Sequence, residues 1–274
     1  MTDARTAEPR DLTGLPTERL FGLDFVSSAT IEEVAERLLL QLRDPAPGWR
    51  GVVTPNVDHL VRYDRYPDEA AVAARAGLVL PDGMPIVWAS RILRRPLRRR
   101  LAGSDLFSLM WPRLADEDLR VVLVAPSEKV VTGLCAEHPG AVGLVPPMFD
   151  VADRATVDRI IDDVIESCAR SGAVMVVVLL SGEKCHLIAS RLAERWSGEN
   201  RVRPVVALLG ASGEFHLGLV ERAPGWMQRS GLEWLHRLAG DPRRLARRYL
   251  VDDRRFVRLV WREWRAGRGS ARGS

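Results

Sequence analysis

Short runs of β-branched and aliphatic residues recur along the chain, with segments of helical periodicity between them. The runs, each typical of a buried strand, are 51–53, 78–80, 121–124, 142–145, 174–180 and 205–209. The helical segments include 31–42, 58–75, 85–93, 130–138, 157–169 and 187–196. Parallel strands need a crossover connection, and a helix normally supplies it. The alternation therefore predicts an α/β fold with a mainly parallel sheet and helices on both faces.

Four segments follow from this pattern. Residues 1–19 are polar and contain no apolar stretch, so we expect a flexible N-terminal segment that is neither a signal peptide nor a membrane anchor. Residues 20–221 hold all the predicted strands and form the Rossmann-like α/β core. Residues 222–265 are helical and rich in arginine and tryptophan, which predicts a C-terminal appendage. Residues 266–274 are low in complexity and are expected to be a disordered tail.

Amino-acid composition indicates the cellular compartment and the class of binding partner. A chain of 274 residues that is 46% hydrophobic and 28% charged suits a globular protein with a full core. Its three cysteines, Cys135, Cys168 and Cys185, lack metal-ligand spacing and indicate a reducing compartment, so we expect a cytoplasmic protein. The net charge is +4, and nearly all the positively charged residues are arginine. This charge favours anionic partners, without distinguishing between phosphate, nucleic acid and membrane. The longest apolar run, 173–180, is too short to span a bilayer, so any membrane contact would be peripheral.

Two polar turns directly follow predicted strands. Ligands of open parallel sheets bind outside the carboxyl ends of the strands, so these turns are the first candidates for a site. In Thr54-Pro55-Asn56, the proline fixes its own φ and lacks an N–H, which holds a hydroxyl and an amide in an ordered turn. Pro81-Asp82-Gly83 places a carboxylate at the same edge. An aspartate before a helix is also an ordinary N-cap, so catalysis and capping are both open for Asp82.

A third candidate is the segment from Arg100 to Leu106, where Gly103 and Ser104 lie at the expected start of a helix. Free N–H groups at such a start bind anions. The alternative is that Ser104 caps the helix while Asp105 interacts favourably with its dipole. The acidic run 116–118 is of the type that holds a metal against a diphosphate, but it precedes a strand and therefore belongs to the opposite sheet edge. We accordingly predict no metal site.

Several other classes of protein find no support. The chain has no Gly-x-Gly-x-x-Gly fingerprint and no P-loop, which argues against a dinucleotide oxidoreductase and an NTPase. No recognised nucleic-acid motif accompanies the arginines, so nucleic acid is not an expected partner. The five histidines are scattered, and each is interpreted as a surface or packed residue rather than a metal ligand; they are His59, His138, His186, His216 and His236.

The turns described above, in this order, resemble the WecG/TagA/CpsF glycosyltransferases, glycosyltransferase family 26, and the likeness extends from about Leu20 to Phe256. In the first half the matching segments are Leu20-Phe21-Gly22-Leu23-Asp24-Phe25, Thr54-Pro55-Asn56, Leu80-Pro81-Asp82-Gly83-Met84-Pro85 and Arg100 through Leu106. In the second half they are Glu214-Phe215, Arg222-Ala223-Pro224, Gly231-Leu232-Glu233-Trp234, Pro242-Arg243-Arg244-Leu245 and Arg248-Tyr249-Leu250.

The resemblance implies an activity. Members of this family move an N-acetylated aminosugar or a related hexose from UDP to an acceptor, typically a polyprenyl-diphosphate-linked sugar in cell-envelope polymer synthesis. They invert the anomeric centre and need no metal. For this chain, that implies a UDP-sugar as co-substrate and no cofactor. It also makes Asp82 the general base that takes the proton of the acceptor hydroxyl, with Thr54 and Asn56 orienting donor and acceptor.

Without a metal, arginines and helix N-termini must stabilise the departing diphosphate. Under the resemblance, the candidate contacts to UDP or substrate are Arg100, Gly103, Ser104, Asp105, Ser181, Lys184 and Arg222. The arginines at 244, 247 and 248 are further candidates, although an arginine run of this kind also solvates a helix face.

The middle of the chain departs from the family pattern. Where the family has a diglycine after its central strand, this chain has Ala125-Pro126-Ser127, and its Gly-x-Pro-Lys-Gln-Glu motif is replaced by Ser181 through His186, with only Lys184 clearly matching. These segments belong to the nucleotide-sugar side of the expected cleft. The departure leaves the donor open and favours, as a second hypothesis, the same chemistry on a soluble small-molecule acceptor. It also permits an inactive scaffold, against which the retained Thr54 and Asp82 argue.

The last predicted helix carries an apolar stripe. Its members, at i, i+3, i+4 and i+8, are Phe256, Leu259, Val260 and Trp264, and arginines 254, 255, 258 and 262 flank them. Such a helix suits the surface of anionic lipid. It equally suits packing on its own domain or on a second subunit of a homo-oligomer. Periodicity does not distinguish lipid from protein, so both interpretations stay open.

Overall fold

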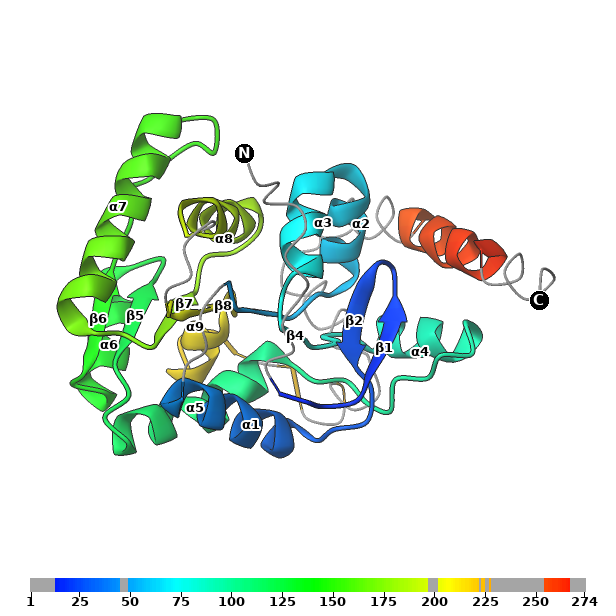
Figure 1. Cartoon of the computed structure of the whole chain (residues 1–274), viewed down its shortest axis with the longest axis horizontal. Helices are drawn as coiled ribbons and strands as arrows, with labels where there is room; N and C mark the ends of the chain where they lie inside the picture. The colour runs from blue at the N-terminus through cyan, green and yellow to red at the C-terminus, as the bar shows by residue number, and fades with distance from the viewer. Residues whose placement is uncertain are drawn as a thin grey trace.

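The computed structural model describes residues 13–44, 49–196, 202–221, 223–224, 227 and 254–266. Within them one sheet runs in the order β1-β2-β4-β3-β8-β7-β5-β6 (Figure 1). Its strands are β1 (Thr17–Leu20), β2 (Leu23–Val26), β3 (Gly51–Val53), β4 (Leu78–Val79), β5 (Val121–Val124), β6 (Ala141–Leu144), β7 (Met175–Val178) and β8 (Val205–Leu208). β1 pairs antiparallel with β2, and the other neighbours are parallel. The predicted α/β fold is confirmed.

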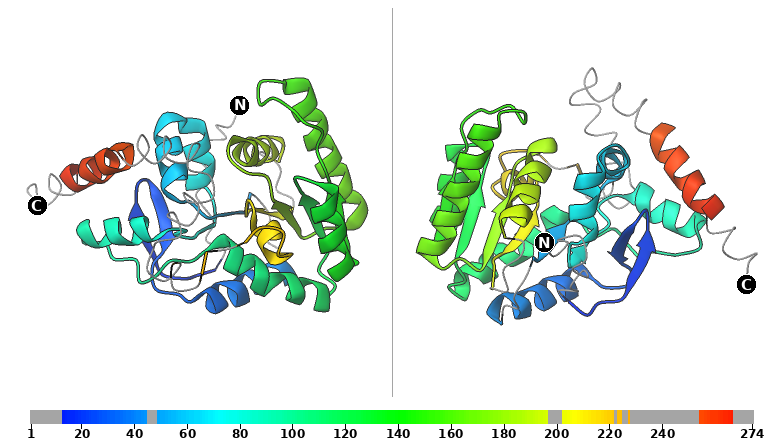
Figure 2. Two further views of the ribbon diagram at one scale, coloured as in Figure 1. Left: turned by 180° about the vertical axis from the view of Figure 1, so that it is seen from behind. Right: turned by 45° about the horizontal axis from the view of Figure 1, so that its top comes forward.

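Helices cover both faces of this sheet, as expected. They are α1 (Ile31–Arg43), α2 (Val57–Arg65), α3 (Pro67–Ala74), α4 (Met84–Ile92), α5 (Gly103–Asp116), α6 (Glu128–Glu137), α7 (Arg154–Ser171), α8 (Glu183–Arg195) and α9 (Ser212–His216), followed by a helix at residues 254–266. In Figures 1 and 2, α2, α3, α7 and α8 lie on one face, and α1, α5, α6 and α9 lie on the other.

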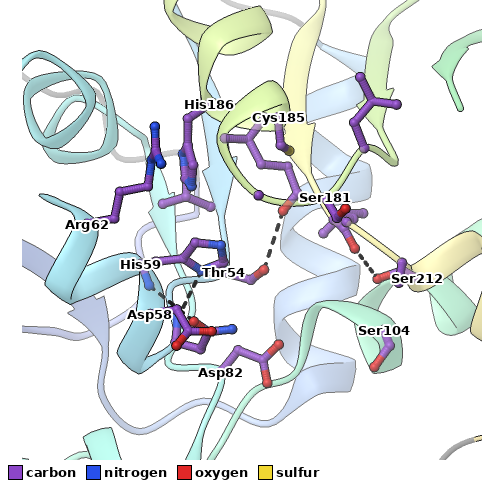
Figure 3. A pocket seen from close by; sticks show the side chains of 18 of the residues that line it. Thr54, Asp58, His59, Arg62, Asp82, Ser104, Ser181, Cys185, His186 and Ser212 are labelled. Carbon is purple, nitrogen blue, oxygen red and sulfur yellow. Dashed lines mark hydrogen bonds between the residues drawn. The ribbon is translucent and has the colours of Figure 1, made fainter. Parts of the chain in front are cut away.

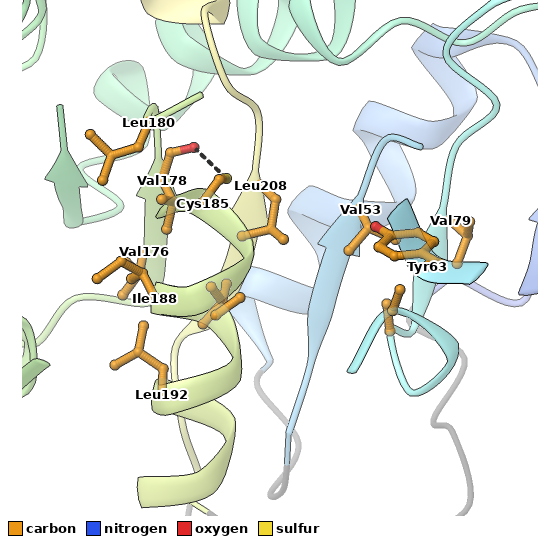
Figure 4. Close-up of a cluster of buried hydrophobic side chains, with 14 of the residues drawn as sticks. Val53, Tyr63, Val79, Val176, Val178, Leu180, Cys185, Ile188, Leu192 and Leu208 are labelled. Carbon is orange, nitrogen blue, oxygen red and sulfur yellow. Dashed lines mark hydrogen bonds between the residues drawn. The ribbon is translucent and has the colours of Figure 1, made fainter. Parts of the chain in front are cut away.

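The core consists of two layers because side chains of a strand alternate between the two faces. In β7, Val176 and Val178 face α7 and α8, whereas Met175 and Val177 belong to the cluster on the opposite face. Figure 4 shows the first layer, in which Ile188 of α8 lies against the β7 valines. Strands buried on both faces need continuous apolar runs, which is why these strands were recognisable from the sequence.

A hairpin precedes the predicted core. β1 and β2 pair through a turn at Phe21 and Gly22, both of which have positive φ, at 53° and 79°. The boundary placed between residues 19 and 20 is therefore wrong, because it cuts through β1; residues 1–12 of the expected flexible segment lie outside the described residues. The hairpin escaped prediction because its short strands carry charged side chains and lack the continuous apolar run of the central strands.

The single helix predicted at 58–75 is two helices. α2 ends at Arg65 and α3 begins at Pro67, with Tyr66 at φ −125° between them. Proline lacks an N–H and disfavours the helical conformation in the residue before it, which accounts for the break.

The helix at 254–266 packs on its own domain through part of its apolar stripe. Phe256 and Leu259 are buried, and the rings of Phe256 and Phe21 are 6.0 Å apart. Arg262 also pairs with Asp64 at 2.6 Å. Of the alternatives that the sequence left open, packing on its own domain is confirmed for these residues. No helix within the described ranges is long and apolar enough to cross a bilayer.

Candidate active site

Four turns at the carboxyl edge of the sheet line one cavity of about 720 Å³ (Figure 3). They follow β4, β3, β8 and β7, which are consecutive neighbours in the sheet. The turn residues in the wall are Thr54, Asn56, Asp82, Leu180, Ser181, Gly182, Leu209, Gly210, Ala211 and Ser212. This volume lies in the range of small-molecule sites, about 300–1,000 Å³. The location is the one that parallel-sheet topology predicts for a ligand.

Thr54 and Asp82 converge in this cavity, as expected from the sequence. The backbone N–H of Asp82 donates to Pro55 O at 3.0 Å, so the two turns are joined directly. Thr54 is buried, and its hydroxyl donates to Leu208 O at 3.4 Å. Gly83 has φ +154°, a conformation that side chains disfavour, and this allows the chain to turn from Asp82 into α4.

Asp82 is paired with Arg100. The Arg100 Nε lies 3.0 Å from Asp82 Oδ1, with the two side chains 14% and 24% exposed. The N-cap of α4 is Gly83 and no side chain caps that helix, so capping, the alternative role for Asp82, is wrong. The backbone N–H of Leu101 donates to Pro81 O at 2.9 Å, which fixes Arg100 beside the turn. Arg100, predicted as a substrate contact, lines the cavity and contacts the carboxylate.

Asn56 has a structural role within the site. Its Oδ1 accepts from the backbone N–H of His59 at 3.2 Å, and its own N–H donates to His59 Nδ1 at 3.2 Å. This reciprocal capping starts α2. The side-chain oxygen thus holds the start of α2, while the NH₂ group makes no part of this cap.

Helix α5 begins at the cavity without a side-chain cap. Its N-cap is Ala102, so the alternative in which Ser104 caps the helix is wrong, and Ser104 lines the cavity. A Cβ on Gly103 would lie 2.9 Å from Thr54 Oγ1 and 3.0 Å from Thr54 Cγ2. Glycine at this position therefore lets α5 approach Thr54. Asp105 lies in the first turn of α5 but is not part of the cavity wall.

Helix α8 also starts at the cavity, and its N-cap, Gly182, provides no side-chain cap. Ser181 and Gly182 line the cavity, as the sequence predicted for Ser181. Lys184 does not: its Nζ lies 4.4 Å from the centre of the Phe149 ring and 3.8 Å from Met148 Sδ. Lys184 points to this neighbouring loop because the helical rotation carries residue 184 away from the side occupied by 182 and 186. Arg222 and the arginines at 244, 247 and 248 lie outside the described residues.

The sequence analysis missed two histidines in the cavity wall, His59 and His186, which it interpreted as surface or packed residues. Their rings meet edge to face with centres 4.9 Å apart, and the Tyr63 ring lies 5.3 Å from that of His186. Both are packed, but on the cavity side. A signal was present, because each falls in the first turns of a helix that begins at the binding edge of the sheet.

Both histidines are neutral near pH 7. Burial lowers the pKa of His59 to about 4, with a further contribution from the Arg62 charge. Burial likewise lowers the pKa of His186 to about 3, helped by His59 and Arg62. Arg62 itself pairs with Glu69 through two hydrogen bonds, which raise its pKa. Among the described residues, no three His, Cys, Asp or Glu side chains form a group suited to a metal ion.

The acidic run 116–118 lies where the sequence placed it. Asp116 ends α5, Glu117 pairs with Arg43 of α1, and the run precedes β5 at the opposite edge of the sheet. None of the three residues lines the cavity.

Comparison with known proteins identifies the family. The "Glycosyl transferase WecG/TagA/CpsF family" matches residues 18–270. An N-acetylglucosaminyldiphosphoundecaprenol N-acetyl-beta-D-mannosaminyltransferase of Bacillus spizizenii is 27% identical over 255 residues, covering 92% of this chain and 93% of the relative. A Bacillus subtilis protein of the same description is 28% identical over 202 residues, covering 71% and 72%. The chain described above, with its parallel sheet and its cavity around Thr54 and Asp82, belongs to the WecG/TagA/CpsF family of glycosyltransferases.

Proposed function

We propose that this protein transfers an N-acetylhexosamine from a UDP-sugar to a hydroxyl of a lipid-linked saccharide in cell-envelope polymer synthesis. The observation that carries the proposal is the convergence of Thr54 and Asp82 in a cavity large enough for a nucleotide sugar. The relatives' name specifies an N-acetylmannosaminyl group and a diphosphoundecaprenol-linked acceptor, and the relative from B. spizizenii matches nearly the full length. N-acetylmannosamine is therefore the first donor sugar to test.

The proposed reaction is a single displacement with inversion. Asp82 takes the proton of the acceptor hydroxyl as its oxygen attacks the anomeric carbon, and the bond from that carbon to UDP breaks, so UDP leaves with the electron pair. A positioned base of this kind contributes about 10²–10⁴ in rate. Arg100, whose Nε lies 3.0 Å from Asp82 Oδ1, holds this carboxylate in the cavity wall. Thr54 lies in the adjoining turn, in position to orient the sugar.

Two helix N-termini support a departing diphosphate without a metal ion. α5 and α8 both begin at the cavity and both lack a side-chain cap, so their first N–H groups are available to oxygen atoms of a ligand. On this basis we propose metal-independent catalysis.

Peripheral membrane contact fits an acceptor held in a bilayer. The outer side of the helix at 254–266 exposes Val257 (66%) and Trp261 (55%), and the Arg265 guanidinium lies 4.3 Å from the Trp261 ring centre. α4 neighbours this helix, because Arg95, shortly after the end of α4, contacts Glu263 at 3.4 Å. α4 also carries an exposed tryptophan, Trp88. Exposed tryptophan among arginines is typical of helices that lie on anionic lipid.

The test is transfer by the purified full chain. It is incubated with UDP-N-acetylmannosamine and a polyprenyl-diphosphate-linked N-acetylglucosamine, and UDP release and product mass are followed. We expect UDP release that depends on the acceptor and a product with one added N-acetylhexosamine. Transfer to free N-acetylglucosamine at an equal rate would favour the soluble-acceptor alternative. No transfer from any UDP-sugar in a panel would contradict the proposal.

A further inference from the structure

The cavity wall contains a buried polar atom that has no hydrogen-bond partner within the described part of the chain, Nε2 of His186. Among the described residues, buried side-chain atoms without a hydrogen-bond partner include Nε1 of Trp49 and Trp111, Oγ of Ser167 and Nε2 of His186. Of these four, His186 alone lines the cavity. Its side chain is 6% exposed, and Figure 3 shows it reaching from α8 toward His59. A buried, unsatisfied nitrogen destabilises the free protein, so its location beside a binding cavity calls for a ligand.

The ring of His186 is held in a defined orientation. His59 meets it edge to face at 4.9 Å between ring centres, and Tyr63 does so at 5.3 Å. His59 is fixed in turn, because its Nδ1 accepts the backbone N–H of Asn56, which leaves the proton of the neutral ring on Nε2. His59 is therefore anchored to the turn that carries Thr54, and the ring of His186 packs against His59. These contacts fix the orientation of the His186 ring relative to Thr54.

A neutral imidazole selects a neutral partner. The pKa of His186 is lowered to about 3 by burial, by His59 and by Arg62, so the ring carries no charge during turnover at neutral pH. It can donate one hydrogen bond and accept one, which suits a hydroxyl or an amide rather than a diphosphate. Arg62, which carries charge nearby, is already paired with Glu69 and lies 3.6 Å from Glu183.

The position of His186 on α8 relates it to the donor. Gly182 is the N-cap of this helix, and His186 follows four residues later, on the same side and one turn further along. A diphosphate held by the first N–H groups of α8 would place the sugar attached to it within reach of that turn.

We infer that His186, oriented by His59 and Tyr63, determines donor specificity by hydrogen bonding a hydroxyl or acetamido group of the transferred sugar. This inference rests on the proposed UDP-sugar function. It predicts that the affinity for the sugar part of the donor, rather than for UDP, depends on the polar edge of the ring. A hydrogen bond of this kind is worth about tenfold in the dissociation constant.

Calorimetric binding of UDP and of UDP-N-acetylmannosamine, in the absence of acceptor, tests the inference. We expect His186→Leu to weaken UDP-N-acetylmannosamine about tenfold and to leave UDP unchanged, while His186→Gln, which is neutral and polar, retains most of the affinity. Should the leucine variant not fold, His186→Phe keeps a ring between His59 and Tyr63 and replaces it. Ser167→Ala is the matched control, because it removes a buried unpartnered oxygen outside the cavity.

Thermal unfolding provides a second readout. Removing an unsatisfied buried group raises the melting temperature, so we expect both His186→Leu and Ser167→Ala to be at least as stable as the wild type without ligand. Only the histidine variant should lose the extra stabilisation that the sugar gives over UDP. Equal weakening of both ligands, unchanged binding of both, or an effect confined to the acceptor KM would overturn the inference. Failure of both ligands to bind the wild type would instead refute the UDP-sugar function, and this inference with it.

Discussion

Replacing Asp82 with asparagine separates the proposed chemistry from the fold. Asparagine has the same shape and keeps one oxygen that can accept a hydrogen bond from Arg100 Nε. In the wild-type protein this nitrogen lies 3.0 Å from Asp82 Oδ1. A hydrogen bond to a charged group contributes about 1.5–3 kcal/mol and one between neutral groups about 0.5–1.5 kcal/mol, so we expect a stability loss of about 1 kcal/mol. In a domain of this size that lowers the melting temperature by about 2–4 °C.

The loss in turnover should be much larger. Without a base, the rate falls by about 10²–10⁴, which corresponds to about 2.7–5.4 kcal/mol of transition-state stabilisation at 1.36 kcal/mol per decade. Acceptor-dependent UDP release measures it, and UDP binding by calorimetry checks that the cavity is intact. Asp24→Asn is the control, because Asp24 pairs with Arg19 at 2.7 Å outside the cavity and should leave turnover unchanged. Full turnover by Asp82→Asn would refute the assignment of the base.

Three further predictions follow from the same structure. Gly103→Ala forces Thr54 to move, because the new Cβ would lie 2.9 Å from Thr54 Oγ1. We expect about 1–3 kcal/mol of destabilisation in urea unfolding and a lower kcat. Wild-type values of both would mean that α5 shifts freely. Acid should destabilise the protein as the pH falls below about 6.5, because unfolded histidines bind protons at their ordinary pKa of 6.5 whereas the folded protein resists protonation of His59 down to about pH 4 and of His186 down to about pH 3. His186→Leu should therefore reduce the dependence of the unfolding free energy on pH in this range. Trp261→Ser should reduce sedimentation with anionic vesicles at unchanged melting temperature, because this side chain is 55% exposed; equal sedimentation would exclude this face as the lipid contact.

The sequence alone determined the fold class and the edge of the sheet where the site lies. Central strands such as β5 and β7 are buried on both faces, so they are continuous apolar runs. Such runs can be recognised from the local sequence alone. Polar turns after such strands are brought to one edge by parallel topology, which is why Thr54 and Asp82 could be paired although 28 positions separate them. The family motifs agreed with this placement.

Tertiary structure decided which polar groups face the cavity and what each one contacts. Arg100 binds Asp82, Asn56 caps α2, and Lys184 turns toward Phe149, although all three fit a substrate role in the sequence. Helical rotation and long-range packing set these directions, and residue type does not encode them. His59 and His186 are 127 positions apart, and their contact depends on α2 and α8 packing on the same face of the sheet. A local pattern carries no information about such a contact, because each helix would look the same without the other.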